Sequence, residues 1–269
     1  MADISIVTAF FDIGRSDWTV DKGLPHYLHR PTQTYLERFG LMAALDNEMV
    51  IYTSAEFVDQ VREYRKGKED KTTIVEVDYK NSFNEIRLAI ATVQTNEDYQ
   101  KLINPIERKN PEYWSADYVL VNALKGYFVN LAIKDNLVSN DLVAWVDFGY
   151  CRNQDMIKGT KWEYDFDPNK IHMFKLKDFD KENTIVSIIS NNDVHVTGGA
   201  IIAGKALWPT FDKLIVHSIT ELLKNNLIDD DQTLLLMATL LKPEFFELYQ
   251  LTHGSDWLQH NSVFNKYNI

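Results

Sequence analysis

The amino-acid sequence predicts an α/β fold with a mainly parallel central sheet that is flanked by helices. Short, continuous apolar runs, beginning with Ile4–Phe11, are typical of strands that are covered on both faces. Amphipathic segments with apolar residues three and four apart separate these runs, and such alternation of strands and helices characterises α/β folds. The chain has 269 residues and no repeat or polar linker, so we expect a single domain over residues 1–269.

The first half of the chain alternates between predicted strands and helices. The strand at Ile4–Phe11 ends at the turn-forming sequence Asp12-Ile13-Gly14-Arg15, and a polar loop rich in histidine follows it. The next predicted elements are a helix at Gln33–Leu45, a strand at Met49–Thr53, a helix from about Ser54, a strand at Thr72–Asp78 and a helix at Phe83–Tyr99.

The second half begins with a long amphipathic pattern that predicts one helix from Glu112 to Lys134. It leads directly into a buried strand, Leu142–Val146. The further predicted elements are strands at Ile171–Lys175 and Thr184–Ile189, a glycine-rich stretch at Thr197–Gly204, and helices at Phe211–Leu223 and Asp230–Leu241.

Composition excludes some classes of function and favours others. With 28 basic and 39 acidic residues the net charge is -11, and no basic run offsets it, so we expect no nucleic-acid partner. The single cysteine, Cys151, allows no internal disulfide and suits a reducing compartment. There is no secretory signal pattern and no apolar stretch of about 20 residues. We therefore expect a cytoplasmic protein whose membrane contact is at most peripheral, at the inner face.

The strongest single feature is Asp147, which directly follows the buried strand Leu142–Val146. Open parallel sheets place their ligands at the carboxyl ends of their strands. A carboxylate at such a position can hold a divalent cation that binds diphosphate oxygens. The simpler interpretation is that Asp147 only caps the turn before Gly149.

Four further residues are candidates for ligand contacts. Asn122 and Lys125 lie three residues apart on the long predicted helix, where the lysine could reach a phosphate or a sugar hydroxyl. A solvated surface lysine explains the pattern equally well. Gly198 and Gly199 would follow a strand and leave backbone amides open to a ligand, although a plain turn also accounts for them.

Three consecutive acids, Asp229-Asp230-Asp231, open a predicted helix and are followed by Gln232. Asp229 and Gln232 fit a capping box, so helix capping is one explanation. Three acids exceed what capping requires, and a carboxylate that faces a sugar could act as a base or stabilise positive charge. His253 is the one histidine that lies in a loop with a neighbouring glycine and a nearby tryptophan.

Several segments together resemble the HtrL/YibB family of bacterial proteins, which are associated with lipopolysaccharide and capsule loci. The matching segments are spread over nearly the whole chain: Ile6–Arg15, Ala144–Gly149, Thr197–Gly204 and Asp231–Leu234. That family looks like the GT-A glycosyltransferases. The resemblance implies a GT-A-like fold with the nucleotide site at the carboxyl ends of the strands.

The resemblance also implies roles for individual residues. Thr8, Phe10 and Arg15 would line the nucleotide site, Gly198 and Gly199 would lie against a sugar, and Asp147 would be the metal-binding aspartate. Asp231-Gln232 resembles a catalytic Asp-Gln at a helix start, and His253-Gly254 resembles a metal-binding histidine loop. The second acid of the expected Asp-x-Asp is replaced by Gly149, so His253 would supply the missing ligand.

The implied activity is that of a nucleotide-sugar-dependent glycosyltransferase in the synthesis of bacterial surface polysaccharide, namely capsule, O-antigen or lipopolysaccharide. Its expected cofactors are a divalent cation, Mn²⁺ or Mg²⁺, and a nucleotide-sugar donor, with a UDP-sugar preferred. The acceptor would be a saccharide or a lipid-linked oligosaccharide. Two alternatives stay open: a sugar nucleotidyltransferase, and a carbohydrate-binding protein whose catalytic site is degenerate.

Overall fold

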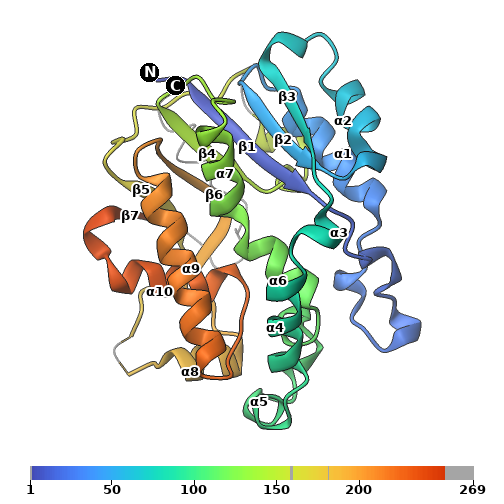
Figure 1. The fold of residues 1–269 in the computed structure, drawn as a ribbon, viewed down its shortest axis with the longest axis vertical. Helices are drawn as coiled ribbons and strands as arrows, with labels where there is room; N and C mark the ends of the chain where they lie inside the picture. Colours follow the sequence, from blue (N-terminus) through green and yellow to red (C-terminus); the bar gives the residue numbers. More distant parts are fainter. Residues whose placement is uncertain (1, 158–159, 181, 252–269) are drawn as a thin grey trace.

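The computed structural model describes residues 2–157, 160–180 and 182–251, and Figure 1 shows their arrangement. Within these residues seven strands form one sheet in the order β3-β2-β1-β4-β6-β5-β7. The strands are β1 (Ile4–Phe10), β2 (Met49–Thr53), β3 (Thr72–Glu76), β4 (Leu142–Val146), β5 (Ile171–Lys175), β6 (Val196–Gly204) and β7 (Phe246–Gln250).

The sheet is mainly parallel, as the sequence predicts. Four neighbouring pairs are parallel, β1 with β2, β1 with β4, β2 with β3, and β5 with β7. Only β6 runs against its neighbours β4 and β5. Because β1 and β4 are parallel neighbours at the centre of the sheet, their carboxyl ends lie at the same edge.

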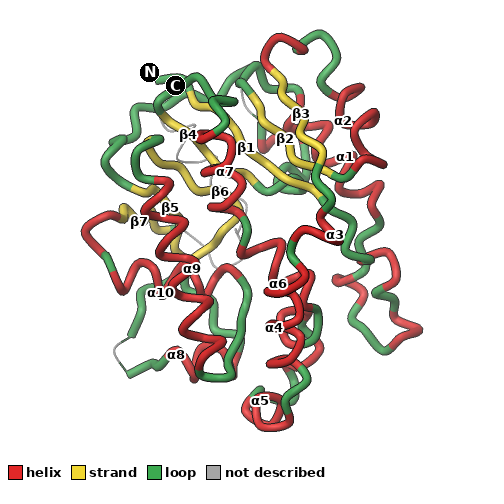
Figure 2. Tube along the Cα trace, viewed as in Figure 1, coloured by secondary structure: helices red, strands yellow, loops and turns green. Residues whose placement is uncertain are grey.

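Helices cover both faces of this sheet. Helices α7 and α9 lie in front of the strands in Figure 1, and α10 contacts β6 on that side. Figure 2 shows α4, α5 and α6 extending beyond the edge of the sheet. The α-helices are α1 (Thr32–Ala43), α2 (Val58–Tyr64), α3 (Tyr79–Ser82), α4 (Asn84–Gln94), α5 (Glu97–Leu102), α6 (Ala116–Ala123), α7 (Lys125–Lys134), α8 (Ile185–Asn191), α9 (Trp208–Lys224) and α10 (Asp231–Leu241).

Side chains on the two faces of the central strands belong to two separate hydrophobic cores. Along β4, Val143 and Trp145 belong to the core beneath α7 and α9, whereas Ala144 and Val146 belong to the core beneath α1. This alternation is the period of two that a strand imposes. It places Asp147, the next residue, in step with Val143 and Trp145.

Several elements differ from the sequence prediction. The single helix predicted at Phe83–Tyr99 is instead α4 and α5, because the side chain of Asn96 caps a new helix. Residues 184–189 are not a strand: Thr184 caps helix α8 in a reciprocal capping box with Ser187, and the local capping outweighs the apolar run. The single helix from Glu112 to Lys134 is instead α6 and α7, because Leu124 leaves helical geometry (φ -82°, ψ 1°). Strand β7 has no counterpart in the prediction.

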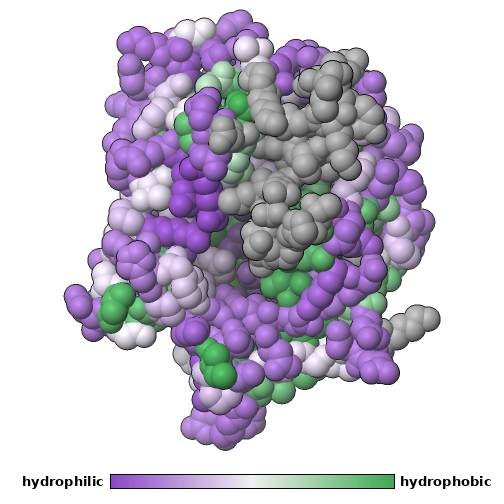
Figure 3. Space-filling view, turned by 180° about the vertical axis from the view of Figure 1, so that it is seen from behind, coloured by the Kyte–Doolittle hydropathy of each residue, from purple (hydrophilic) through white to green (hydrophobic). Residues whose placement is uncertain are grey.

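The molecular surface is largely hydrophilic on the face that Figure 3 shows, with only small hydrophobic patches among the described residues. None of the helices in residues 2–157, 160–180 and 182–251 is long and apolar enough to cross a membrane.

Candidate functional site

A cavity of about 320 Å³ opens at the carboxyl ends of β1 and β4. Its wall combines the loop after β1, the loop after β4, the adjoining ends of α6 and α7, the start of β6 and the first residues of α10. The edge where parallel strands end is where open α/β sheets bind ligands. The location of the cavity therefore agrees with the expected position of the site.

Lys125, the first residue of α7, lies at the base of the cavity and is 4% exposed. Its Nζ lies 2.9 Å from Asp147 Oδ1 and 2.7 Å from Asp231 Oδ2, and it donates to the carbonyl oxygen of Gly198 at 2.9 Å. Three contacts use the three protons of an ammonium group. Lys125 therefore joins three segments that are distant in the sequence.

The charge state of Lys125 follows from these neighbours. Burial by itself would lower the pKa of the ammonium group, but the carboxylates of Asp147 and Asp231 outweigh burial and raise the pKa above its usual value. Lys125 is thus positively charged throughout the neutral pH range. A buried ammonium group flanked by two carboxylates leaves this part of the site with a net negative charge of one when both acids are ionised.

One carboxylate oxygen of Asp147 is bound by the protein, and part of the side chain is exposed to solvent. Oδ1 accepts a hydrogen bond from Trp145 Nε1 at 2.8 Å as well as contacting Lys125, and the side chain is 39% exposed. The backbone N–H of Asp147 donates to the carbonyl oxygen of Gly199 at 3.0 Å. Asp147 is therefore more than a turn cap, because its side chain belongs to the wall of the cavity.

Gly198 makes the approach of Asp231 possible. A Cβ atom added at Gly198 would lie 1.7 Å from Asp231 Oδ2, far inside van der Waals contact. Both glycines lie within β6 and not after a strand, which corrects the sequence prediction. The absence of a side chain at Gly198 lets a carboxylate, and not a ligand, come close to the strand.

The acids at the start of α10 divide into different roles. Asp230 is the N-cap, because its side chain accepts from the backbone N–H of Gln232 at 3.0 Å. Asp229 accepts from Thr233 Oγ1 at 2.7 Å, so the predicted capping pair of Asp229 and Gln232 is wrong. Asp231 is the first helical residue, where the helix dipole favours an anion, and its carboxylate is free for Lys125.

Buried acids continue behind this helix start. Burial and the carboxylate of Asp229 raise the pKa of Glu112 to about 8, and burial raises the pKa of Asp229 to about 7. Burial and neighbouring carboxylates also raise the pKa of Asp230. These groups hold protons near neutral pH, which limits the repulsion among them.

A second part of the cavity wall is basic. Arg15, Arg30 and Arg152 line it, and Arg38 on α1 lies beside it, with its Cδ 3.9 Å from a Cβ added at Gly149. The same added atom would lie 2.8 Å from Tyr35 Cδ1. An acid in place of Gly149 would therefore displace Tyr35, which is a structural reason for the departure from Asp-x-Asp.

Most of the expected site residues come together here. Thr8 does not, because it is fully buried in β1 and is not part of the cavity wall. His253 lies outside the described residues. The residues that line the cavity as expected are Phe10, Arg15, Asn122, Lys125, Asp147, Gly198, Gly199, Asp231 and Gln232.

Sequence reasoning missed several residues of the cavity wall, including Arg30, Tyr35, Tyr118 and Arg152. None of them belongs to a recognisable motif. The one available signal was the position of Arg30 and Arg152 in loops next to predicted strand ends or helix starts. Loops at that edge supply ligand contacts in α/β folds.

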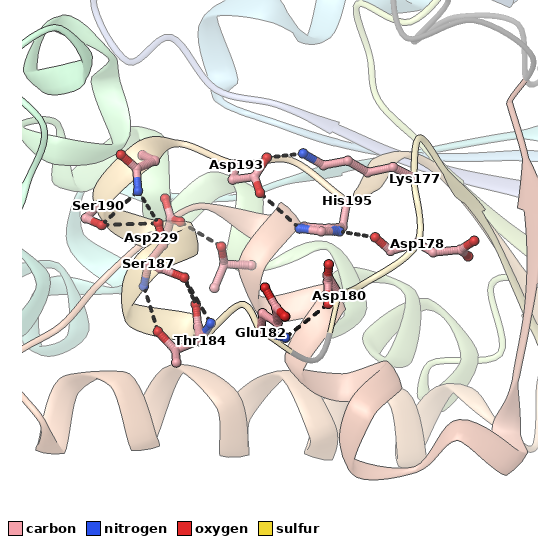
Figure 4. A network of polar contacts seen from close by, with 12 residues as sticks. Lys177, Asp178, Asp180, Glu182, Thr184, Ser187, Ser190, Asp193, His195 and Asp229 are labelled. Carbon is pink, nitrogen blue, oxygen red and sulfur yellow. Dashed lines mark hydrogen bonds and ion pairs between the residues drawn. The ribbon is translucent and has the colours of Figure 1, made fainter.

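The two buried histidines of the described region, His172 and His195, are held by contacts within the protein. Figure 4 shows His195 between Asp178 and Asp193, where its Nδ1 lies 3.0 Å from the carbonyl oxygen of Asp178 and its Nε2 lies 3.3 Å from Asp193 Oδ2. His172 Nδ1 lies 2.9 Å from Tyr249 Oη. Across the described part of the chain there is no group of three or more His, Cys, Asp or Glu residues suited to hold a metal ion.

Comparison with known proteins identifies the family. Residues 2–266 match the model of a family described as a bacterial protein of unknown function, HtrL_YibB. Protein HtrL of Escherichia coli (strain K12) is 41% identical over 254 residues, which cover 93% of this chain and 88% of that protein. The chain therefore belongs to the HtrL/YibB family, and the resemblance found in the sequence is confirmed.

Two solved structures align over nearly the whole chain at low identity. Mouse xyloside xylosyltransferase 1 is 12% identical, with coverage of 99% of this chain and 94% of that one and a TM-score of 0.44. The inositol-1-phosphate CTP transferase from T. maritima is 11% identical, with coverage of 98% and 95% and a TM-score of 0.44. At that level of similarity neither structure carries an argument about activity.

Proposed function

For this member of the HtrL/YibB family we propose that the cavity transfers a sugar from a nucleoside diphosphate sugar to a saccharide acceptor. The proposal rests on one observation: a cavity of ligand size lies at the carboxyl ends of β1 and β4, and both the Lys125–Asp147–Asp231 cluster and several arginines line it. The anionic diphosphate of such a donor suits the arginines, and its polar sugar suits the Lys125–Asp147–Asp231 cluster. The acceptor belongs to surface polysaccharide synthesis and is a saccharide or a lipid-linked oligosaccharide.

The residues of the acidic wall have distinct tasks in this proposal. Asp231 and Gln232 face the transferring sugar, where a carboxylate stabilises the positive charge that develops at the anomeric carbon. Lys125 positions both carboxylates, since its three protons are already used within the protein. Asn122 lines the same cavity and offers amide groups to sugar hydroxyls.

A divalent cation, Mn²⁺ or Mg²⁺, is part of the proposal through Asp147. The described residues offer this cation only part of a binding site. Oδ1 of Asp147 contacts Lys125 and Trp145, so Oδ2 is the oxygen of this side chain that is left for a metal. His253 is the proposed second ligand and would favour Mn²⁺. The cation would supply charge neutralisation at the departing diphosphate. We expect turnover to fall in excess EDTA and to return when Mn²⁺ is added, whereas full turnover in EDTA would remove the cation from the proposal.

The decisive assay incubates the purified protein with a panel of nucleotide sugars and saccharide acceptors and measures release of nucleoside diphosphate. A UDP-sugar is the first donor to test. Asp231→Asn should lower turnover by about 100-fold or more without loss of folding, because Asp230 and not Asp231 caps α10. Asp98→Asn, on the exposed surface of α5, is the matched control. An Asp231→Asn protein that melts and turns over like the wild type would contradict the assigned role.

The same assay separates the two alternatives. A sugar nucleotidyltransferase would release pyrophosphate when it is given a nucleoside triphosphate and a sugar phosphate. A degenerate carbohydrate-binding protein would bind saccharide with no release of either product. In the first case thermal stabilisation should be largest with the triphosphate, because a ligand stabilises the native state in proportion to its occupancy.

A further inference from the structure

Four arginine side chains gather at the cavity: Arg15, Arg30 and Arg152 line it, and Arg38 lies beside it. Arg15 follows β1, Arg30 precedes α1, Arg38 lies on α1, and Arg152 lies in the loop after β4. We call these four residues the arginine wall. Burial, followed by the charges of Arg30 and Arg38, lowers the pKa of Arg152 to about 10, and burial and the charge of Arg30 lower the pKa of Arg38.

The arginine wall has no ion-paired counter-charge among the residues that the structure describes. In residues 2–157, 160–180 and 182–251 none of its four members forms an ion pair with a carboxylate, although the chain carries a net charge of -11. Two arginines elsewhere do have an acidic partner: Arg62 contacts Asp59 at 2.5 Å, and Arg87 contacts Asp117 at 2.7 Å. Four guanidinium groups that lie together with no ion-paired carboxylate among the described residues form a site suited to an external anion.

The four members differ in how much of their hydrogen-bonding capacity the protein uses. Arg15 is 8% exposed; it donates to the carbonyl oxygen of Leu28 at 3.1 and 3.3 Å and to Tyr35 Oη at 2.7 Å, and it lies over the ring of Trp18. Its donors are therefore held by neutral acceptors. Arg15 thus contributes a fixed positive charge to the arginine wall, because the protein already uses its hydrogen-bond donors.

Arg30, Arg38 and Arg152 have no side-chain hydrogen bond within the described part of the chain, unlike the buried Arg65. Arg65 donates to the carbonyl oxygens of Ala43, Leu45 and Asn47 and serves the fold. Arg30 and Arg152 instead line the cavity. Planar guanidinium groups bind phosphate oxygens in pairs, and several of them can hold a diphosphate from more than one side.

We propose that Arg30, Arg38 and Arg152, supported by Arg15, bind the diphosphate of the donor, and that this binding requires no divalent cation. The inference rests on the proposed function for the identity of the donor. It adds separate roles within the cavity to that function. The arginine wall binds the diphosphate, whereas Asp231 faces the transferring sugar and Asp147 holds the cation. Inorganic pyrophosphate carries the recognised group alone and is the probe.

The experiment measures pyrophosphate binding to the full chain by calorimetry in the presence of EDTA. We expect saturable binding that is at least tenfold tighter than that of inorganic phosphate. Affinity should fall as salt is raised, because the contacts are ionic. Arg30→Gln and Arg152→Gln should each weaken binding by about ten- to a hundred-fold, and Arg152→Lys should lose less because it keeps the charge.

Arg62→Gln is the matched control, because Arg62 is exposed on α2 and should leave binding unchanged. Melting curves of every variant show that the fold is intact. The proposal is overturned if the wild type binds pyrophosphate no better than phosphate, or only when Mn²⁺ is present, or if both glutamine variants bind like the wild type. Loss of sugar transfer with intact pyrophosphate binding would instead refute the proposed function, so the two failures are distinguishable.

Discussion

Replacing Gly198 with alanine is the sharpest perturbation that the structure offers. The added Cβ would lie 1.7 Å from Asp231 Oδ2 and 3.1 Å from Leu235 Cδ1. An ordinary carbon–oxygen contact is about 3.4 Å or more, in the range of non-bonded contacts. Asp231 must therefore move by well over 1 Å, and it cannot do so without weakening its 2.7 Å contact with Lys125.

Two consequences of Gly198→Ala can be given magnitudes. Inserting a methyl group into a packed site costs about 1–3 kcal/mol of unfolding free energy. Misplacement of a catalytic group by about 1 Å costs on the order of 100-fold in turnover. Turnover should therefore fall by about 100-fold while the protein stays folded, because a loss of about 1–3 kcal/mol is less than the roughly 5–15 kcal/mol of stability that a typical protein has. Denaturant unfolding and the nucleoside diphosphate assay, made on the same preparation, measure both.

The control for this variant lies in the same strand. A Cβ added at Gly204 would lie 2.4 Å from the carbonyl oxygen of Pro168, at the other end of β6 from the cavity. Gly204→Ala should destabilise the fold by a similar or larger amount and leave turnover per folded molecule unchanged. If Gly198→Ala turns over like the wild type while remaining folded, the position of Asp231 does not matter for catalysis and our reasoning is refuted.

Two further predictions concern charge. Lys125→Met should cost about 3–5 kcal/mol in urea unfolding, because it leaves Asp147 and Asp231 facing each other without a cation; a smaller loss than about 1 kcal/mol would show that the two acids become protonated at little cost. Glu112 and Asp229 bind protons more tightly in the folded than in the unfolded chain, so stability should be highest near pH 4 and fall as the pH rises to about 8. A difference of one unit in pKa between the folded and unfolded chain corresponds to about 1.4 kcal/mol of stability. Glu112→Gln should make the loss of stability with pH less steep, as measured by urea unfolding at several pH values. An equally steep loss in that variant would exclude Glu112 as its source.

The sequence by itself determined the class of fold, and it predicted the edge of the sheet at which the candidate cavity lies. The apolar runs at Ile4–Phe10 and Leu142–Val146 are buried on both faces, so their composition alone identifies them as central strands. The residue after such a strand lies at the edge where ligands bind, which is why Asp147 could be found without coordinates. The short apolar run at 184–189 was wrongly predicted as a strand, because the capping interaction between Thr184 and Ser187 makes it a helix.

Only the tertiary structure decided which side chains meet. Lys125, Asp147 and Asp231 are separated by up to 106 positions in the chain, and no local pattern states that one ammonium group joins them. The close approach of Asp231 to Gly198 and the gathering of Arg30, Arg38 and Arg152 likewise depend on how loops from different strands converge at one edge. Helix propensity and strand periodicity act over a few residues, whereas these contacts arise from the packing of α1, α7 and α10 against a common sheet, which fixes distances that the sequence leaves open.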